Sequence, residues 1–131
     1  MPDPALARSL LPLALRLSDA ARAAILPIFR TAAACNPHNK DLNGFDPVTE
    51  ADRASERVMR EIISAERPDD AVEGEEYGSS PGKSGLTWYL DPIDGTRAFV
   101  AGLPSWCVLI GLVKDGGPIL GIIDQPWLDE R

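Results

Sequence analysis

Hydrophobic residues recur with helical spacing at the start of the chain. Over residues 3–34 apolar side chains return every three or four positions, which places them on one face of a helix. Asp3 followed by Pro4 is typical of a helix start, with the aspartate as N-cap and the proline in the first turn. Pro12 and Pro27 are expected to start, kink or split this helix, because proline has no amide hydrogen to donate.

A second amphipathic helix is predicted after a polar loop. Residues 35–47 are rich in Asn, Asp, Gly and Pro, which is typical of turns. Thr49 is the expected N-cap, and Asp52 lies where a capping box places an acid. An apolar stripe then runs to Arg67, and Pro68 ends the helix.

The remaining chain has the pattern of strands. Four short apolar runs span residues 71–73, 86–90, 106–113 and 119–123. The first is expected to be an edge strand, and Asp115-Gly116 between the last two indicates a hairpin. Residues 77–86 are rich in Gly, Ser and Pro, which predicts a mobile loop. Helices followed by strands favour an α+β or layered domain over residues 1–131.

Composition and charge narrow the function classes. The chain has 131 residues, 44% of them hydrophobic, which is ordinary for one globular domain. The net charge of −7 argues against binding a nucleic-acid backbone or an anionic membrane. The longest apolar run near the start is six residues, whereas a membrane span needs about 20. Cys35 and Cys107 lack metal-ligand spacing, so free thiols in a cytoplasmic protein are expected.

The most informative segment is Asp91-Pro92-Ile93-Asp94-Gly95-Thr96, directly after a predicted strand. Its proline bends the chain, which allows both aspartates and the Ile93 carbonyl to face one point. These are the hard oxygen ligands that Mg²⁺ prefers. Gly95 permits a close approach of another group to the backbone, and Thr96 offers a hydroxyl to hold a water molecule.

Two further acidic segments join this one. Gly74-Glu75-Glu76 offers a carboxylate beside a predicted strand, and Asp52 ends a segment that begins at Asp46. Asp52 is expected to orient Thr96. Taken alone, each segment is an ordinary turn, solvated loop or helix cap. Together they predict a site for divalent cations, which suits phosphoryl transfer.

Other metal, phosphate and hydrolase motifs do not fit. Twelve residues counted from Asp91 end at Gly102, where an EF-hand requires a glutamate. There is no P-loop or Rossmann glycine pattern. The single histidine, His38, has no serine context that would favour a catalytic triad, and we interpret it as a surface residue.

In this order the three acidic segments resemble the inositol monophosphatase superfamily of Mg²⁺-dependent, lithium-sensitive phosphatases, from about Lys40 to the end of the chain. The resemblance implies the first part of a layered αβαβα fold. We therefore expect an α+β fold with two N-terminal helices packed on a mostly antiparallel sheet. The implied ligands of two or three Mg²⁺ ions are Glu75, Asp91, the Ile93 carbonyl and Asp94.

The resemblance also implies roles in catalysis and substrate binding. Glu75 and Thr96, supported by Asp52, would position the attacking water, with no covalent intermediate. The residues expected to contact substrate are Gly95, Thr96 and Arg97, and those near a third metal or the phosphate are Glu76 and Lys40. Lithium would be an inhibitor.

Details of the last third resemble the bacterial histidinol-phosphatase branch. Residues 102–106, residues 121–126 and Glu130-Arg131 carry this likeness, and Arg97-Ala98-Phe99 replaces the Thr-Asn-Phe type of sequence seen in inositol-specific members. A small phosphorylated metabolite is therefore the expected partner. Histidinol phosphate is favoured, and inositol monophosphate or a nucleotide 3′-phosphate are the alternatives.

The family also has a later Trp-Asp-x-x-Gly-type motif and a C-terminal half that builds the substrate pocket. Only 35 residues follow Thr96. We therefore expect an N-terminal portion of a longer, dimeric enzyme, with little or no activity by itself. The competing hypothesis is a non-catalytic fragment that binds metal or dimerises.

Overall fold

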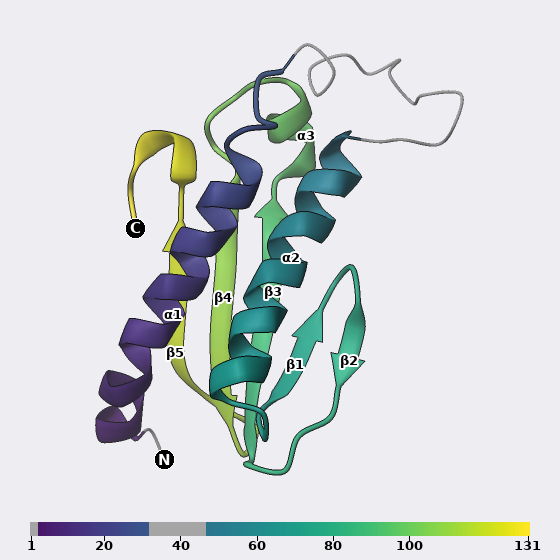
Figure 1. The fold of residues 1–131 in the computed structure, drawn as a ribbon. Helices are drawn as coiled ribbons and strands as arrows, with labels where there is room; N and C mark the ends of the chain where they lie inside the picture. Colours follow the sequence, from purple (N-terminus) through teal and green to yellow (C-terminus); the bar gives the residue numbers. More distant parts are fainter. Residues whose placement is uncertain (1–2, 32–46) are drawn as a thin grey trace.

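The computed structural model describes residues 3–31 and 47–131 (Figure 1). Two long helices lie side by side on one face of a five-stranded sheet. In chain order the elements are α1 (Pro4–Ile25), α2 (Pro47–Glu66), β1 (Ala71–Gly74), β2 (Gly78–Ser80), β3 (Leu86–Asp94), α3 (Thr96–Val100), β4 (Cys107–Lys114), β5 (Gly117–Asp124) and the 3-10 turn η1 (Pro126–Leu128). The α+β prediction is confirmed. None of the helices described in these two ranges has the length and apolar character of a membrane span.

Helix α1 begins as its sequence predicts and ends earlier. The side chain of Asp3 accepts a hydrogen bond of 3.1 Å from the Leu6 amide, which confirms the N-cap. The prediction that the helix runs to residue 34 was wrong, because it ends at Ile25. Pro27 follows the C-cap and cannot donate the next helical hydrogen bond. Pro12 lies inside the helix without splitting it.

Helix α2 begins at Pro47, two residues before the predicted start. Thr49 therefore lies within the first turn, and the prediction that it is the N-cap was wrong. Proline is favoured in the first turn because its missing amide hydrogen has no helical partner there. The helix ends at Glu66, and Pro68 follows as predicted.

The sheet has the order β2-β1-β3-β4-β5. Only β1 and β3 pair in parallel, and the other neighbours are antiparallel, so the sheet is mostly antiparallel as expected. The prediction that β1 is an edge strand was wrong. Residues Gly78–Ser80, inside the predicted mobile loop, form the edge strand β2 instead. Its three small residues carry no apolar pattern, because backbone hydrogen bonds to β1 and side-chain contacts such as that of Ser79 with Glu73 hold the strand.

The β4–β5 hairpin confirms the Asp115-Gly116 signal. Both residues have positive φ, 47° for Asp115 and 84° for Gly116, as a two-residue type I′ turn requires. Strand β4, Cys107–Lys114, is shifted by one residue from the predicted run 106–113, and β5, Gly117–Asp124, is longer than the predicted 119–123.

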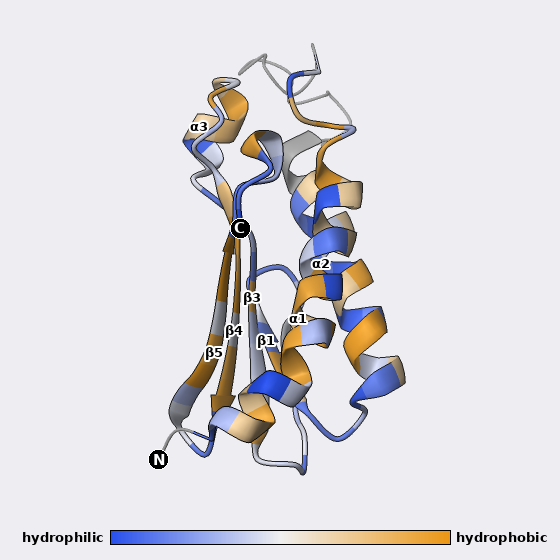
Figure 2. Cartoon of the chain, turned by 90° about the vertical axis from the view of Figure 1, so that its left-hand side faces the viewer, coloured by the Kyte–Doolittle hydropathy of each residue, from blue (hydrophilic) through white to orange (hydrophobic). Residues whose placement is uncertain are grey.

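Alternation along the strands divides the sheet into a covered and an open face. Trp88, Val108 and Leu112 point toward the helices and are fully buried. On the other face Tyr89 is 49% exposed and Ile123 is 67% exposed. Figure 2 shows both long helices on one side of the sheet, and no described helix covers the opposite side.

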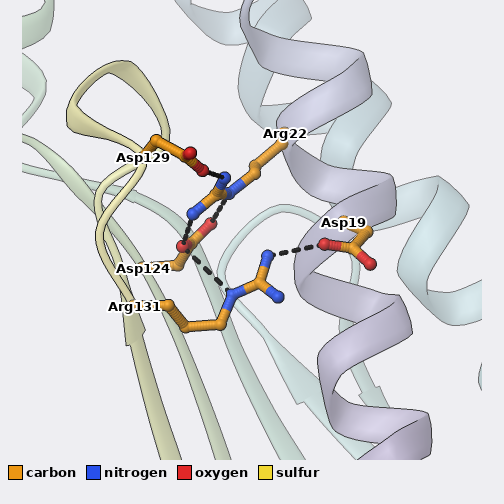
Figure 3. A network of polar contacts seen from close by, with 5 residues as sticks. All are labelled: Asp19, Arg22, Asp124, Asp129 and Arg131. Carbon is orange, nitrogen blue, oxygen red and sulfur yellow. Dashed lines mark hydrogen bonds and ion pairs between the residues drawn. The ribbon is translucent and has the colours of Figure 1, made fainter.

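A network of charged groups fastens the end of the chain to α1 (Figure 3). Arg22 donates hydrogen bonds of 2.6 and 2.5 Å to the two carboxylate oxygens of Asp124, which is fully buried, and a further bond to Asp129. Arg131 donates to Asp124 at 3.2 Å and to Asp19 at 2.6 Å. The bidentate arginine contact is the strong geometry for such a pair. It fixes the end of β5 against the helix layer.

Candidate active site

The strand β3 continues beyond its apolar run and carries the two candidate aspartates. Its predicted end was Leu90, but the ladder extends to Asp91, which pairs with Leu109, and to Asp94, which pairs with Cys107. Two residues of β3 therefore oppose one residue of β4 between these pairs, which is a β-bulge.

The bulge places both aspartates on the same face of the sheet. In a regular strand, residues three apart point to opposite faces. Here the partners Leu109 and Cys107 are two apart on β4, so they share a face, and Asp91 and Asp94 share it with them. Pro92 supplies the physical cause, since it has no amide hydrogen for a regular ladder and is tolerated at bulges.

The chain turns from β3 into α3 at Gly95, whose φ is 91°. L-residues with side chains rarely adopt this backbone conformation, and a Cβ here would lie 3.4 Å from the Cα of Trp106. The short helix α3 was not predicted. It begins with Thr96, which is exposed beside Gly95 and Arg97.

The parallel pairing of β1 with β3 positions the third carboxylate. Gly74 is in register with Leu90, so Glu75, the first residue after β1, follows beside Asp91 of β3. Glu75, Glu76 and Tyr77 form the turn between β1 and β2. The Glu75 and Asp91 carboxylates also interact electrostatically, because the charge of Glu75 raises the pKa of Asp91.

The acids crowd one another, and the 3.8 Å ion pair between Arg53 and Glu76 offsets only part of their charge. Burial, and then the charges of Glu76, Asp91 and Glu75, raise the pKa of Asp52 to about 7. Burial, and then Glu75 and Asp94, raise the pKa of Asp91 to about 6, although the Ile93 amide partly opposes this. Helix α2 thus directs Asp52 toward the carboxylates of the sheet edge.

The donor set fits a hard divalent cation. In the part of the chain that the structure describes, Oδ1 of Asp91 is buried and has no hydrogen-bond partner. A cation beside these carboxylates would satisfy this oxygen and lower both raised pKa values. Among the same described residues, no three Asp, Glu, Cys or His side chains already lie close enough together to hold a metal ion. The backbone therefore brings the donors to one edge of the sheet, and the side chains would have to rotate to reach a common cation.

A hollow of about 730 Å³ extends from these acids along the open face. Glu75 and Asp91 lie on its border, and Tyr89 is also among its lining residues. Across from Tyr89 the register places Gly111 and then Gly121, so bare backbone forms that part of the surface.

Several predicted site residues are not joined by contacts. No hydrogen bond links Asp52 to Thr96 within residues 47–131, so the role of Asp52 in orienting Thr96 stays a prediction. Arg97 is exposed on α3. Lys40, His38 and Cys35 lie outside the described residues.

Two residues near the site were missed by sequence reasoning. Cys107 is a free thiol whose Sγ lies 3.8 Å from Oδ2 of Asp94, and burial followed by Asp94 raises its pKa. Its place follows from strand register, for which the sequence carries no signal. Glu56 is fully buried and contacts the Glu75–Tyr77 turn. Its spacing of four residues from Asp52, on the same helix face, is the signal that could have found it.

The raised pKa of Asp52 predicts a pH-dependent penalty in the metal-free protein. Its pKa of about 7 in the folded chain exceeds the usual 3.8, so folding loses stability as the pH rises between these values. Asp52→Asn is therefore expected to narrow the difference in Tm between pH 5 and pH 8, measured by thermal unfolding in EDTA. Glu61→Gln, an exposed change on the same helix, is the control. If the difference in Tm between pH 5 and pH 8 were unchanged in Asp52→Asn, the claim that neighbouring carboxylates raise the pKa of Asp52 would be contradicted.

Comparison with known proteins agrees with this geometry. A sequence profile described as the inositol monophosphatase family matches residues 10–131. The histidinol-phosphatase of Mycobacterium tuberculosis is 48% identical over 85 residues, which cover 65% of this chain and 33% of that protein. The histidinol-phosphatase of Streptomyces coelicolor is 41% identical over 119 residues, which cover 88% of this chain and 43% of that protein.

A solved structure has the same fold over nearly all of the chain. An inositol monophosphatase from Zymomonas mobilis superimposes with a TM-score of 0.80 and 46% identity, covering 95% of this chain and 46% of that one. The chain thus spans less than half the length of each of these three relatives.

Proposed function

The chain belongs to the inositol monophosphatase family, and on that premise we propose that it forms the metal-binding part of a Mg²⁺-dependent phosphomonoesterase. The observation that supports this most is the bulge in β3, which turns Asp91 and Asp94 to one face beside Glu75. We further propose that residues 1–131 are the N-terminal α+β portion of the complete fold.

In this proposal the metal ligands are Glu75, Asp91, the Ile93 carbonyl and Asp94. When bound, Mg²⁺ supplies charge neutralisation for the phosphate and lowers the pKa of water. Glu75 and Thr96 hold the attacking water, with Asp52 orienting the threonine hydroxyl. Lithium would inhibit by competing at the same oxygens.

The substrate phosphate is proposed to lie beside α3. Gly95 presents backbone without a side chain, and Thr96 and Arg97 are exposed next to it. Arg97 adds positive charge to a mainly acidic site, and its planar guanidinium can donate hydrogen bonds to two oxygens of one phosphate. Water attacks in line with the leaving oxygen in one displacement, so no covalent phosphoenzyme forms.

Histidinol phosphate is the proposed substrate, because the Mycobacterium tuberculosis and Streptomyces coelicolor relatives are named histidinol-phosphatases. Inositol monophosphate is the alternative, supported by the structural match to the Zymomonas mobilis enzyme. A nucleotide 3′-phosphate is the third member of the test panel.

The test measures phosphate release from these three esters with Mg²⁺, with EDTA and with added Li⁺. The 131-residue chain is compared with the product of its coding frame read beyond Arg131, wherever that frame continues. Histidinol phosphate is expected to be hydrolysed fastest by the longer product, with inhibition by EDTA and Li⁺. Release that persists in EDTA, or that is confined to esters outside the panel, would contradict the assignment.

The competing proposal is a metal-binding or dimerising fragment without catalysis. It is favoured by the open sheet face, where Tyr89 and Ile123 are exposed, since large apolar patches promote association. Sedimentation velocity over a range of concentrations separates a monomer from a dimer. Turnover of histidinol phosphate by the isolated chain would reject this reading.

A further inference from the structure

The turn that carries Glu75 is held from the helix layer by a buried carboxylate. Glu56 on α2 accepts hydrogen bonds from the backbone amides of Glu76 at 3.0 Å and of Tyr77 at 2.8 Å. The Glu56 side chain is fully buried. Hydrogen bonds to an ionised acceptor are stronger than those between neutral groups, so this contact strongly restrains the two peptides that follow Glu75.

Gly74 makes the close approach possible. A Cβ on this residue would lie 2.5 Å from the Cδ atom and from Oε1 of Glu56. The carboxylate therefore occupies the space in which any other residue would place its side chain. This gives the Gly-Glu-Glu sequence a steric reason, because the glycine admits the group that restrains the turn.

Arg60 completes the contact and extends it to β2. Its Nε donates to Glu56 at 3.1 Å, and its Nη1 donates to the Ser80 hydroxyl at 3.0 Å. Its Nη2 donates to the Gly78 carbonyl. The arginine balances the buried charge, and its rigid fork joins Glu56, and through it the turn, to the edge strand β2.

We propose that Glu56, balanced by Arg60, is a positioning residue that sets the place of Glu75 at the metal site. The inference rests on the proposed function, in which Glu75 is a metal ligand. Asp52 lies one helical turn before Glu56, so the same face of α2 directs one carboxylate to the site and uses the next to hold the turn. Glu56 itself does not bind the metal.

The first test is Glu56→Gln in the 131-residue chain. The amide keeps the length of the side chain, but it has one acceptor oxygen for two peptide donors and no charge for Arg60. The affinity for Mn²⁺, read from the electron paramagnetic resonance signal of the free ion, is expected to fall about tenfold, as partners behind metal ligands commonly show. Hydrogen exchange of the Glu76 and Tyr77 amides should accelerate.

A matched control is Asp70→Asn. Asp70 is also a buried carboxylate, paired with Arg67 at 2.9 Å and accepting from Trp88 at 3.0 Å, but it lies before the start of β1, away from Gly74. This variant is expected to lower Tm. Because changes at distant sites act nearly independently, the affinity for Mn²⁺ should stay within about twofold of that of the unmodified chain.

A second variant separates geometry from charge and guards against misfolding of the first. Gly74→Ala changes no charge, yet its Cβ must displace the Glu56 carboxylate. It is expected to weaken Mn²⁺ binding in the same way. Affinity that is unchanged in both Glu56→Gln and Gly74→Ala would overturn the positioning role.

Failure of the proposed function would give a different result, because the unmodified chain would then show no affinity for Mn²⁺. In that case the rate of hydrogen exchange tests the positioning role of Glu56. Amides of Glu76 and Tyr77 that exchange as slowly in Glu56→Gln as in the unmodified chain would overturn it, whereas faster exchange would support it.

Discussion

Arg22→Leu is expected to lower the free energy of unfolding by about 3 kcal/mol, because it leaves a buried carboxylate with one of its two arginines removed. Asp124 is 0% exposed and Arg22 is 18% exposed, so water cannot replace the lost hydrogen bonds. Arg131 still donates to Asp124 at 3.2 Å, which keeps the cost at the lower end of the range for broken buried pairs. Urea denaturation at pH 7 measures the change.

The control is Arg16→Leu on the same helix. Arg16 pairs with Glu66 at 2.6 Å, but the two side chains are 55% and 41% exposed. Solvent screens such a pair, so its loss is expected to cost under about 1 kcal/mol. Equal costs for the two variants would contradict the special role of the buried pair.

Acid should reveal the same contact. Burial opposes ionisation of Asp124, but Arg22 and Arg131 outweigh it and hold the pKa of Asp124 below its usual 3.8. A lowered folded pKa stabilises the protein above the unfolded value, and this stability is lost as the pH falls through the folded value. The acid loss of stability is therefore expected to be weaker in Arg22→Leu than in the unmodified chain.

Asp94→Asn is expected to weaken divalent-cation binding by at least about 100-fold, since even residues behind metal ligands cost roughly 10–100-fold when changed. The amide has nearly the shape of the carboxylate, and Asp94 is exposed at the end of β3, so the fold should persist. Free Mn²⁺ measured by electron paramagnetic resonance reports the affinity. Phosphate release reports turnover in the longer product, where the loss should be at least as large.

Asp115→Asn provides the matched control. Asp115 lies in the β4–β5 turn with a φ of 47°, a conformation that asparagine tolerates. It removes the same charge at the hairpin turn, beyond the Leu86 end of β3 rather than the Asp94 end. If both variants weaken Mn²⁺ binding equally, net charge rather than ligation by Asp94 explains the effect.

Local patterns accounted for the elements whose stability is local. The N-cap at Asp3, the apolar stripe of α2 and the Asp115-Gly116 turn were readable because each depends on residues close in sequence. The end of α1 was placed nine residues too late and the start of α2 two residues too late, since several helix signals lie close together there. Strand β2 and helix α3 were missed because small polar or short segments gain their order from neighbours distant in sequence.

The side-chain chemistry of the candidate site could also be predicted from the sequence. The acidic segments around Asp52, Glu75 and Asp91 named the candidate oxygen donors and indicated the family, because side-chain chemistry can be read without the fold. Whether these donors meet does depend on it. Residues three apart in a strand point away from each other unless a bulge intervenes, and the bulge exists only where β3 pairs with β4.

By itself, then, the sequence determined the two long helices, most strands, the candidate ligands and the phosphatase family. Tertiary structure alone decided that Asp91 and Asp94 share a face, that Glu75 lies beside them, and that Glu56 holds the turn. The physical reason is that hydrogen-bond partners between strands and between helix and turn are far apart in the chain. Their pairing is selected by the burial of the whole core, which no local pattern records.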